Sequence, residues 1–139
     1  MNRGRLSKQL EIDEGRKRRI YLDSVGKWTG GVGRNLTDRG FRDDEIDLML
    51  SNDIDEAIGI ARALVPTFDK LDDVRQEVVA NMAFNLGMTR LAGFKQFIAA
   101  LVRFDYQRAT SEMMDSKWYD QVGDRGKRLA YAMREGRFE

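Results

Sequence analysis

The sequence of 139 residues contains no cysteine and no histidine. Disulfide bonds, cysteine nucleophiles, Ser-His-Asp triads and histidine-based zinc sites are therefore excluded. Any catalysis must use mainly carboxylates, hydroxyls, lysine, arginine or tyrosine. Since paired carboxylates are the commonest way to do acid/base chemistry without imidazole, candidate active residues are sought among Asp and Glu.

An apolar run long enough to cross a bilayer is also missing, and the first ten residues lack the apolar region of a signal peptide. We therefore expect the chain to be made and folded in the cytoplasm. The 24 basic residues nearly balance the 23 acidic ones, so no overall positive field favours nucleic acid. The basic run from Arg16 to Arg19 has no interleaved aromatic residues and indicates a solvated face, so no nucleic-acid partner is expected.

The first 42 residues predict a short helix followed by a small sheet. Leu6 and Leu10 are spaced for a helix that ends near Gly15. From Lys17 to Thr37, alternating apolar residues, a turn at 23–26 and several strand and turn glycines predict antiparallel strands. A further turn is expected at 37–40.

Helical patterns occupy the rest of the chain. Apolar residues at three- and four-residue steps predict a long amphipathic helix from about Asp43 to the only proline, Pro66. The segment from Asp73 to Leu86, which ends at Gly87, is so widely apolar that it should be the central buried helix. Three more helices are expected at about 94–104, 106–115 and 124–135, the last with Asp124 as its N-cap.

Together these elements predict a single α+β domain. A small antiparallel sheet lobe at about 15–42 would be joined by a long helix at about 43–65 to a larger helical lobe, formed by residues 1–14 and 66–139. A helix of about twenty residues spans roughly 30 Å, which is long enough to bridge two lobes.

Three short segments resemble the catalytic stretch of the T-even phage lysozyme family, which includes phage endolysins. They are Ile12 to Gly15, Ile20 to Asp23 and Gly26 to Gly33. In that family a Glu, then an Asp or Cys after eight intervening residues, then a Thr after five more, form the active site, and Glu14, Asp23 and Thr29 match both spacings. The resemblance continues through later segments and covers nearly the whole chain: 71–75, 81–87, 92–94, 118–121 and 125–128.

The resemblance implies a lysozyme-like fold and a peptidoglycan hydrolase, a muramidase that needs neither metal nor cofactor. The bond cut would be the β-1,4 bond between N-acetylmuramic acid and N-acetylglucosamine, with inversion. Glu14, at a helix end facing a sheet, is expected to be partly withdrawn from water, which favours the protonated form that a general acid needs. Asp23 would orient the attacking water as a carboxylate, with the Thr29 hydroxyl as a second holder. Inversion predicts carboxyl groups about 6.5 to 9.5 Å apart.

Four other residues are candidates for substrate binding. Arg125 matches a family position beside the general acid, where it would hold Glu14 in place, and an exposed charge is an equally good interpretation. Phe84 and Asn85 suit a sugar ring with an N-acetyl group and are expected at the cleft floor, although a core role for Phe84 is nearly as well favoured. Asn35 is a candidate for the opposite wall.

The chain departs from the family pattern in two places. Arg34 stands where many members have a histidine, and we predict that it pairs with Asp53 on the long helix, by a bond that does not titrate near neutrality. Only residues 38–42 connect the sheet to that helix, and this short connection removes part of the upper cleft wall.

The resemblance also implies a biological setting. A monomeric endolysin without stable membrane insertion would wait in the host cytoplasm until a holin-type pore released it to the wall, in phage-mediated lysis. The absence of an added wall-binding module favours a host with a thin, Gram-negative-type wall. A role in virion entry stays open. The alternatives in activity are a lytic transglycosylase, and a wall-binding or virion component that kept the fold without the chemistry.

Overall fold

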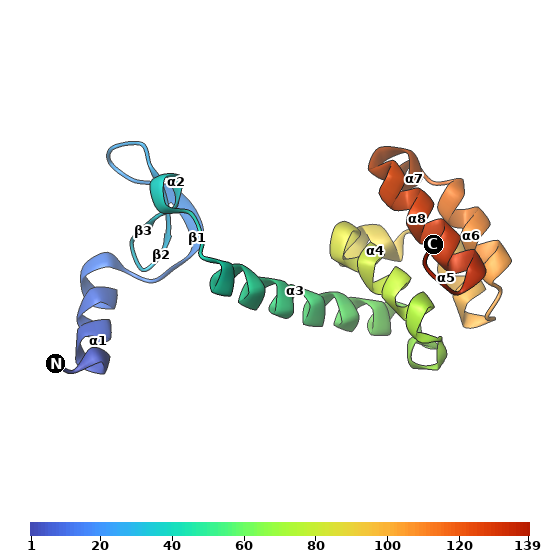
Figure 1. The fold of residues 1–139 in the computed structure, drawn as a ribbon, viewed down its shortest axis with the longest axis horizontal. Coiled ribbons are helices and arrows are strands. Elements are labelled where there is room, and N and C mark those ends of the chain that lie inside the picture. The colour runs from blue at the N-terminus through green and yellow to red at the C-terminus, as the bar shows by residue number, and fades with distance from the viewer. The chain divides into compact units, whose positions relative to one another are not determined.

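The computed structural model describes all 139 residues, which form two compact units, Met1–Leu48 and Met49–Glu139. Figure 1 labels most of their helices and strands, which are numbered in chain order. The first helix lies in the same unit as the sheet, and its expected place in the helical lobe stays a prediction.

The first helix, α1 (Arg3–Glu14), begins and ends at caps that satisfy its backbone. Asn2 accepts a hydrogen bond from a first-turn N–H at 2.9 Å. Gly15 has a φ of 78° and donates its N–H to a carbonyl of the last turn at 2.9 Å. Because glycine adopts a positive φ at little cost, the helix ends there, as predicted, and Glu14 is its last residue.

The predicted sheet is confirmed. It has three antiparallel strands in the order β1 (Lys17–Leu22), β2 (Trp28–Gly31) and β3 (Arg34–Asn35). Thr29 lies opposite Tyr21 on one side and Asn35 on the other. Since directly opposite residues point to the same face, these three side chains share one face of the sheet.

A one-turn helix, α2 (Leu36–Arg39), replaces most of the turn expected at 37–40. Its N-cap is Asn35, whose side chain accepts the N–H of Asp38 at 3.0 Å, and Gly40, at a φ of 62°, ends it. The turn prediction is wrong because the same polar residues that favour turns also cap helices.

The next element, α3 (Asp43–Leu64), is one continuous helix with the predicted bounds, drawn in green in Figure 1. Three acidic residues occupy its first turn, Asp43, Asp44 and Glu45, where negative charge is favourable to the helix dipole. Pro66, which has no N–H to offer, follows its end.

The second unit continues with helices only. They are η1 (Phe68–Lys70), α4 (Asp73–Ala92), α5 (Lys95–Val102), α6 (Tyr106–Met114), α7 (Lys117–Val122) and α8 (Asp124–Glu135). We predicted that α4 ends at Gly87. This residue, with a φ of 77°, does interrupt the helical geometry, but the helix resumes after it and continues to Ala92. The α7 helix was not expected. The N-cap of α8 is Gly123 rather than Asp124, which is instead its first residue.

The core of this unit is built around α4, as predicted. Val78, Val79 and Met82 have no exposed surface. The side chains of Phe97, Met113, Leu129 and Met133, from α5, α6 and α8, belong to the same buried cluster. Burying one such side chain is worth about 1.5 to 3 kcal/mol, so this cluster stabilises the unit. None of the helices combines the length and apolar character that a bilayer crossing requires.

Candidate active site

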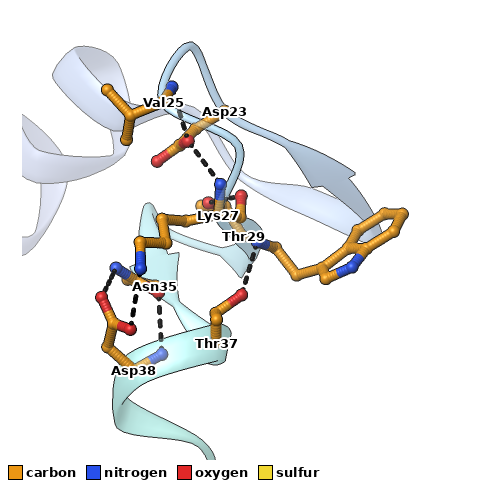
Figure 2. A network of polar contacts seen from close by, with 8 residues as sticks. Asp23, Val25, Lys27, Thr29, Asn35, Thr37 and Asp38 are labelled. Carbon is orange, nitrogen blue, oxygen red and sulfur yellow. Dashed lines mark hydrogen bonds and ion pairs between the residues drawn. The ribbon is translucent and has the colours of Figure 1, made fainter.

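Asp23 is fixed by its own turn. The residue follows β1, and one oxygen of its carboxylate, Oδ1, accepts the N–H of Val25 at 3.0 Å and the N–H of Lys27 at 2.8 Å. These bonds, drawn in Figure 2, form an Asx-type turn that connects β1 to β2. Neither amide contacts Oδ2, so this oxygen is left to accept another proton.

The backbone of Lys27 connects Asp23 to Thr29. Its N–H donates to the Asp23 carboxylate, and its carbonyl accepts the Thr29 hydroxyl at 3.1 Å (Figure 2). The same carbonyl also accepts the Asp23 N–H at 2.9 Å. Thr29 is only 5% exposed. Its Oγ1 therefore has a fixed direction, with its proton on Lys27 and its lone pairs left to accept a hydrogen bond.

Glu14 packs against the turn between β2 and β3. Its side chain lies over Gly33: a Cβ built on that glycine would be 2.7 Å from Oε2 of Glu14. Both residues line an open cavity of about 450 Å³ with Val32 and several side chains of α1. Glu14 is exposed, so the residues of this unit do not shield its carboxyl group from water as we expected.

Asn35 is occupied by contacts within the sheet unit. Its Oδ1 caps α2, and its Nδ2 donates to Asp38 at 2.9 Å, while Lys27 Nζ lies 3.2 Å from the same carboxylate (Figure 2). These bonds from Lys27 and Asn35 lower the pKa of Asp38. Thr37 Oγ1 accepts the N–H of Trp28 at 2.8 Å. The network attaches α2 to β2, and substrate binding by Asn35 stays a prediction.

The predicted pair of Arg34 with Asp53 is wrong, because Arg34 forms an ion pair with Glu45 in the first turn of α3. Asp53 lies eight residues further along the same helix, or about 12 Å, beyond the reach of a guanidinium held at Glu45. The Arg34 hydrogen bond and the Arg42 N–H, at 2.7 Å, lower the pKa of Glu45 from 4.5 to about 2. An ion pair therefore does connect the sheet to α3, but it involves Glu45, which lies about two helical turns before the predicted partner Asp53.

Phe84 and Asn85 differ in what they can offer a ligand. Phe84 is 47% exposed and lines a cavity of about 220 Å³ with Asp53 and Glu56. A purely core role does not fit this exposure. Asn85 accepts the indole N–H of buried Trp118 at 2.8 Å through Oδ1. Its carbonyl thus has a structural task, which leaves the amide nitrogen for a ligand.

Arg125 is half-buried rather than an exposed charge. Its Nε and Nη2 both donate to Asn81 Oδ1, at 3.0 and 2.7 Å, so α8 is joined to α4. The contact of Arg125 with Glu14 stays a prediction. No group of three or more acidic residues in the structure is placed to hold a metal ion.

A family model described as phage lysozyme matches residues 11–135. The chain belongs to the phage lysozyme family. It is therefore a lysozyme-type glycosidase, a peptidoglycan hydrolase with the α+β fold expected from the resemblance.

Curated relatives are distant but cover most of this lysozyme. It is 22% identical to "Probable T4-type lysozyme 2" of Dictyostelium discoideum over 94% of each chain, and 23% identical to "Probable T4-type lysozyme 1" of the same organism over 91% of this chain and 92% of that one. It is also 24% identical, over 96% of its length, to the pre-baseplate central spike protein Gp5 of Enterobacteria phage T4. The match spans only 28% of that longer protein.

The lysozyme brings the three predicted catalytic residues into one unit. Asp23 and Thr29 share the Lys27 backbone, and Glu14 contacts the turn that follows the Thr29 strand. Sequence reasoning missed the backbone of Lys27, which no side-chain pattern can indicate. It also missed the task of Asn35, although an Asn three residues before an Asp could have been recognised as a helix cap.

Proposed function

We propose that this lysozyme is a muramidase that cleaves the β-1,4 bond between N-acetylmuramic acid and N-acetylglucosamine by an inverting mechanism. The observation that carries the proposal is the shared backbone of Lys27, which holds one carboxylate and one hydroxyl with an acceptor position available on each. Two acceptors of this kind suit a water molecule that must lose a proton as it attacks.

In the proposed reaction Glu14 protonates the oxygen that leaves with N-acetylglucosamine. The bond from that oxygen to the anomeric carbon breaks while water attacks from the opposite face. Asp23 Oδ2 accepts the proton of the water, and Thr29 Oγ1 accepts a hydrogen bond from its second hydrogen. Glu14 and Asp23 then return to their starting states by proton exchange with solvent. Since Glu14 is exposed in its unit, the bound sugar must help to exclude water.

For the second unit we propose that Phe84 and Asn85 contact the glycan. An exposed aromatic ring offers a flat apolar surface to a sugar face, and the Asn85 amide offers a donor to an N-acetyl carbonyl. Arg125, held by Asn81, is proposed as a further binding residue.

The test is digestion of purified peptidoglycan, with the fragments identified by mass spectrometry and NMR. Wild type is expected to release reducing muramic acid ends that first appear as the α anomer. Glu14→Gln, compared at matched folding, is expected to lose on the order of 10² to 10⁴ of the rate. Anhydromuramyl ends would identify a lytic transglycosylase and overturn the proposal. Binding without clearing of a wall suspension would identify a non-catalytic wall protein.

The proposed setting is phage-mediated lysis, with a monomer held in the host cytoplasm until a holin-type pore releases it to the wall. The expected result is that cytoplasmic expression in a Gram-negative host leaves cells intact until the inner membrane is permeabilised. Lysis without permeabilisation would contradict it.

The relationship to the T4 spike protein favours a second candidate, a virion-borne lysozyme used at entry. Detection of the chain by mass spectrometry in purified particles, rather than only in the lysate, would support this second setting.

A further inference from the structure

Gly33 and Glu14 are in closer contact than their sequence separation suggests. A Cβ built on Gly33 would lie 2.7 Å from Oε2, 2.9 Å from Cβ and 3.0 Å from Cδ of Glu14. The Glu14 side chain therefore runs along the bare face of the glycine, from its first carbon to its carboxyl group.

We propose that Gly33 is a positioning residue, whose missing side chain sets where the Glu14 carboxyl lies during glycoside hydrolysis. This inference rests on the proposed function. It concerns the placement of the general acid, and Gly33 itself takes no part in the proton transfer.

The contact cannot be relieved by rotating the Glu14 side chain. Rotation would move Oε2 and Cδ away, but the Cβ position of Glu14 is fixed by the backbone of α1. A methyl group at position 33 would still meet that Cβ at 2.9 Å. Either the end of α1 or the turn must therefore shift.

Both sides of the contact are anchored inside one unit. Glu14 stands between the α1 helix and Gly15, whose N–H is bonded to the helix at 2.9 Å, and β1 begins two residues later. The turn that contains Gly33 is held by the pairing of β2 with β3, in which Gly30 faces Arg34. A shift forced at this contact would therefore move the acid relative to the sheet that carries Asp23 and Thr29.

The expected consequence is a loss of kcat with little change in KM. Acid catalysis needs the carboxyl within hydrogen-bond reach of the leaving oxygen, and a displacement of about 1 Å in a catalytic group costs on the order of 10²-fold in rate. Substrate affinity depends on contacts along the whole glycan and should change much less.

Gly31 provides a matched control for the backbone. It lies two residues earlier with a φ of 61°, against 63° for Gly33, but a Cβ built on it meets nothing within 4 Å. Gly31→Ala and Gly33→Ala therefore share the cost of a positive φ, and only the second adds the clash with Glu14.

The experiment compares wild type, Gly31→Ala and Gly33→Ala for kcat, KM and the pH profile of kcat on a soluble glycan fragment, beside thermal unfolding. Both variants are expected to lose stability through the positive φ, and Gly33→Ala is expected to lose more because it adds the clash with Glu14. An approximately 10²-fold lower kcat and a displaced pH profile are expected for Gly33→Ala alone. The proposal is overturned if the two variants have kcat values within a few-fold of each other.

If Gly33→Ala does not fold, a second variant still tests the contact. Adding Glu14→Gly removes all three close atoms, so recovery of folding in the double variant supports the contact, and failure to recover overturns it. If wild type itself does not hydrolyse the glycan, the proposed function fails. The stability comparison still decides whether Gly33 accommodates Glu14.

Discussion

The N–H of Lys27 donates a 2.8 Å hydrogen bond to the carboxylate of Asp23, and Val25 donates a second to the same oxygen. The turn therefore needs an oxygen acceptor at position 23 but not a negative charge. An asparagine carbonyl can accept both bonds in the same way. The structural and chemical tasks of Asp23 can thus be separated by substitution.

Asp23→Asn is expected to fold with nearly the wild-type unfolding midpoint and to lose on the order of 10² to 10⁴ of its rate, because the amide cannot take the proton of the water. Asp23→Ala should lose activity too. It should also lose about 1 kcal/mol or more of stability, because two backbone donors lose their acceptor. Peptidoglycan clearing and thermal unfolding of both variants provide the check. An active Asp23→Asn enzyme would remove Asp23 from the mechanism.

Thr29 can be tested by keeping or removing its hydroxyl. Thr29→Ser keeps a donor to the Lys27 carbonyl and an acceptor for water, so activity within about tenfold of wild type is expected. Thr29→Val has a similar shape without the hydroxyl, and a loss on the order of 10² in kcat is expected. The stability cost of valine should be only about 1 kcal/mol, since the Lys27 carbonyl keeps its bond to the Asp23 N–H. Equal activity of the two variants would contradict the proposed water position.

Sequence reasoning succeeded where a single local feature decides the structure. Gly15 and Pro66 end helices through their own backbone properties, and the alternation from Lys17 onward predicts strands without reference to the rest of the chain. The three catalytic candidates depended on a family resemblance. For any one of them alone, an ordinary role at a helix end, turn or strand would have been the better interpretation.

Prediction from the sequence failed where several residues could have been the partner of one side chain. Several acidic residues of α3 were possible partners for Arg34. The ion pair forms with Glu45 because the first turn of that helix lies beside Arg34, a position that the sequence does not reveal. The α7 helix has six residues, too few for a periodic pattern, and begins at a Ser116 cap that resembles any other polar turn. The close approach of Glu14 to Gly33 is a tertiary contact that neither segment contains.

The Arg34 pair makes a prediction about pH. Because the folded-state pKa of Glu45 lies below its ordinary value, its stabilising effect is fully present above about pH 4.5 and is lost as the pH falls toward 2. Glu45→Gln should therefore unfold at a lower temperature than wild type at pH 7, and the difference should shrink through this window. Asp44→Asn is the control, because Asp44 pairs with Arg42 at 3.3 Å on an exposed surface and should matter little. A difference for Glu45→Gln that does not change with pH would contradict this account.

The carbonyl oxygen and the amide nitrogen of Asn85 can be tested separately by substitution. Asn85→Asp keeps the acceptor for the Trp118 indole but loses the amide donors, so it should fold normally and show a KM for a soluble glycan about 2- to 10-fold higher. Asn85→Leu leaves a buried indole N–H without a partner and should cost about 1 to 3 kcal/mol of stability. An unchanged KM in Asn85→Asp would restrict Asn85 to its structural bond with Trp118.

Arg75, in the first turn of α4, closes the C-terminal end of α8. Its Nε donates to the carbonyl of Met133 at 2.8 Å and its Nη2 to that of Arg134 at 2.9 Å, while its guanidinium lies 3.8 Å from the ring centre of Tyr106. The side chain is only 14% exposed. A lysine ammonium cannot donate both of these hydrogen bonds and at the same time stack on the Tyr106 ring as the planar guanidinium does.

Arg75→Lys is therefore expected to lose about 1 to 3 kcal/mol of unfolding free energy, from weakened bonds to the helix-end carbonyls and a weaker cation–π contact. Arg108→Lys serves as the control, since Arg108 pairs with Glu112 one helical turn away on a side chain that is 53% exposed. Surface pairs of this kind contribute about 0.3 to 0.5 kcal/mol. Urea unfolding of both variants measures the difference. If they shift the unfolding free energy equally, the buried guanidinium does no more than an ordinary surface charge, and the joining of α4, α6 and α8 must depend on their apolar contacts.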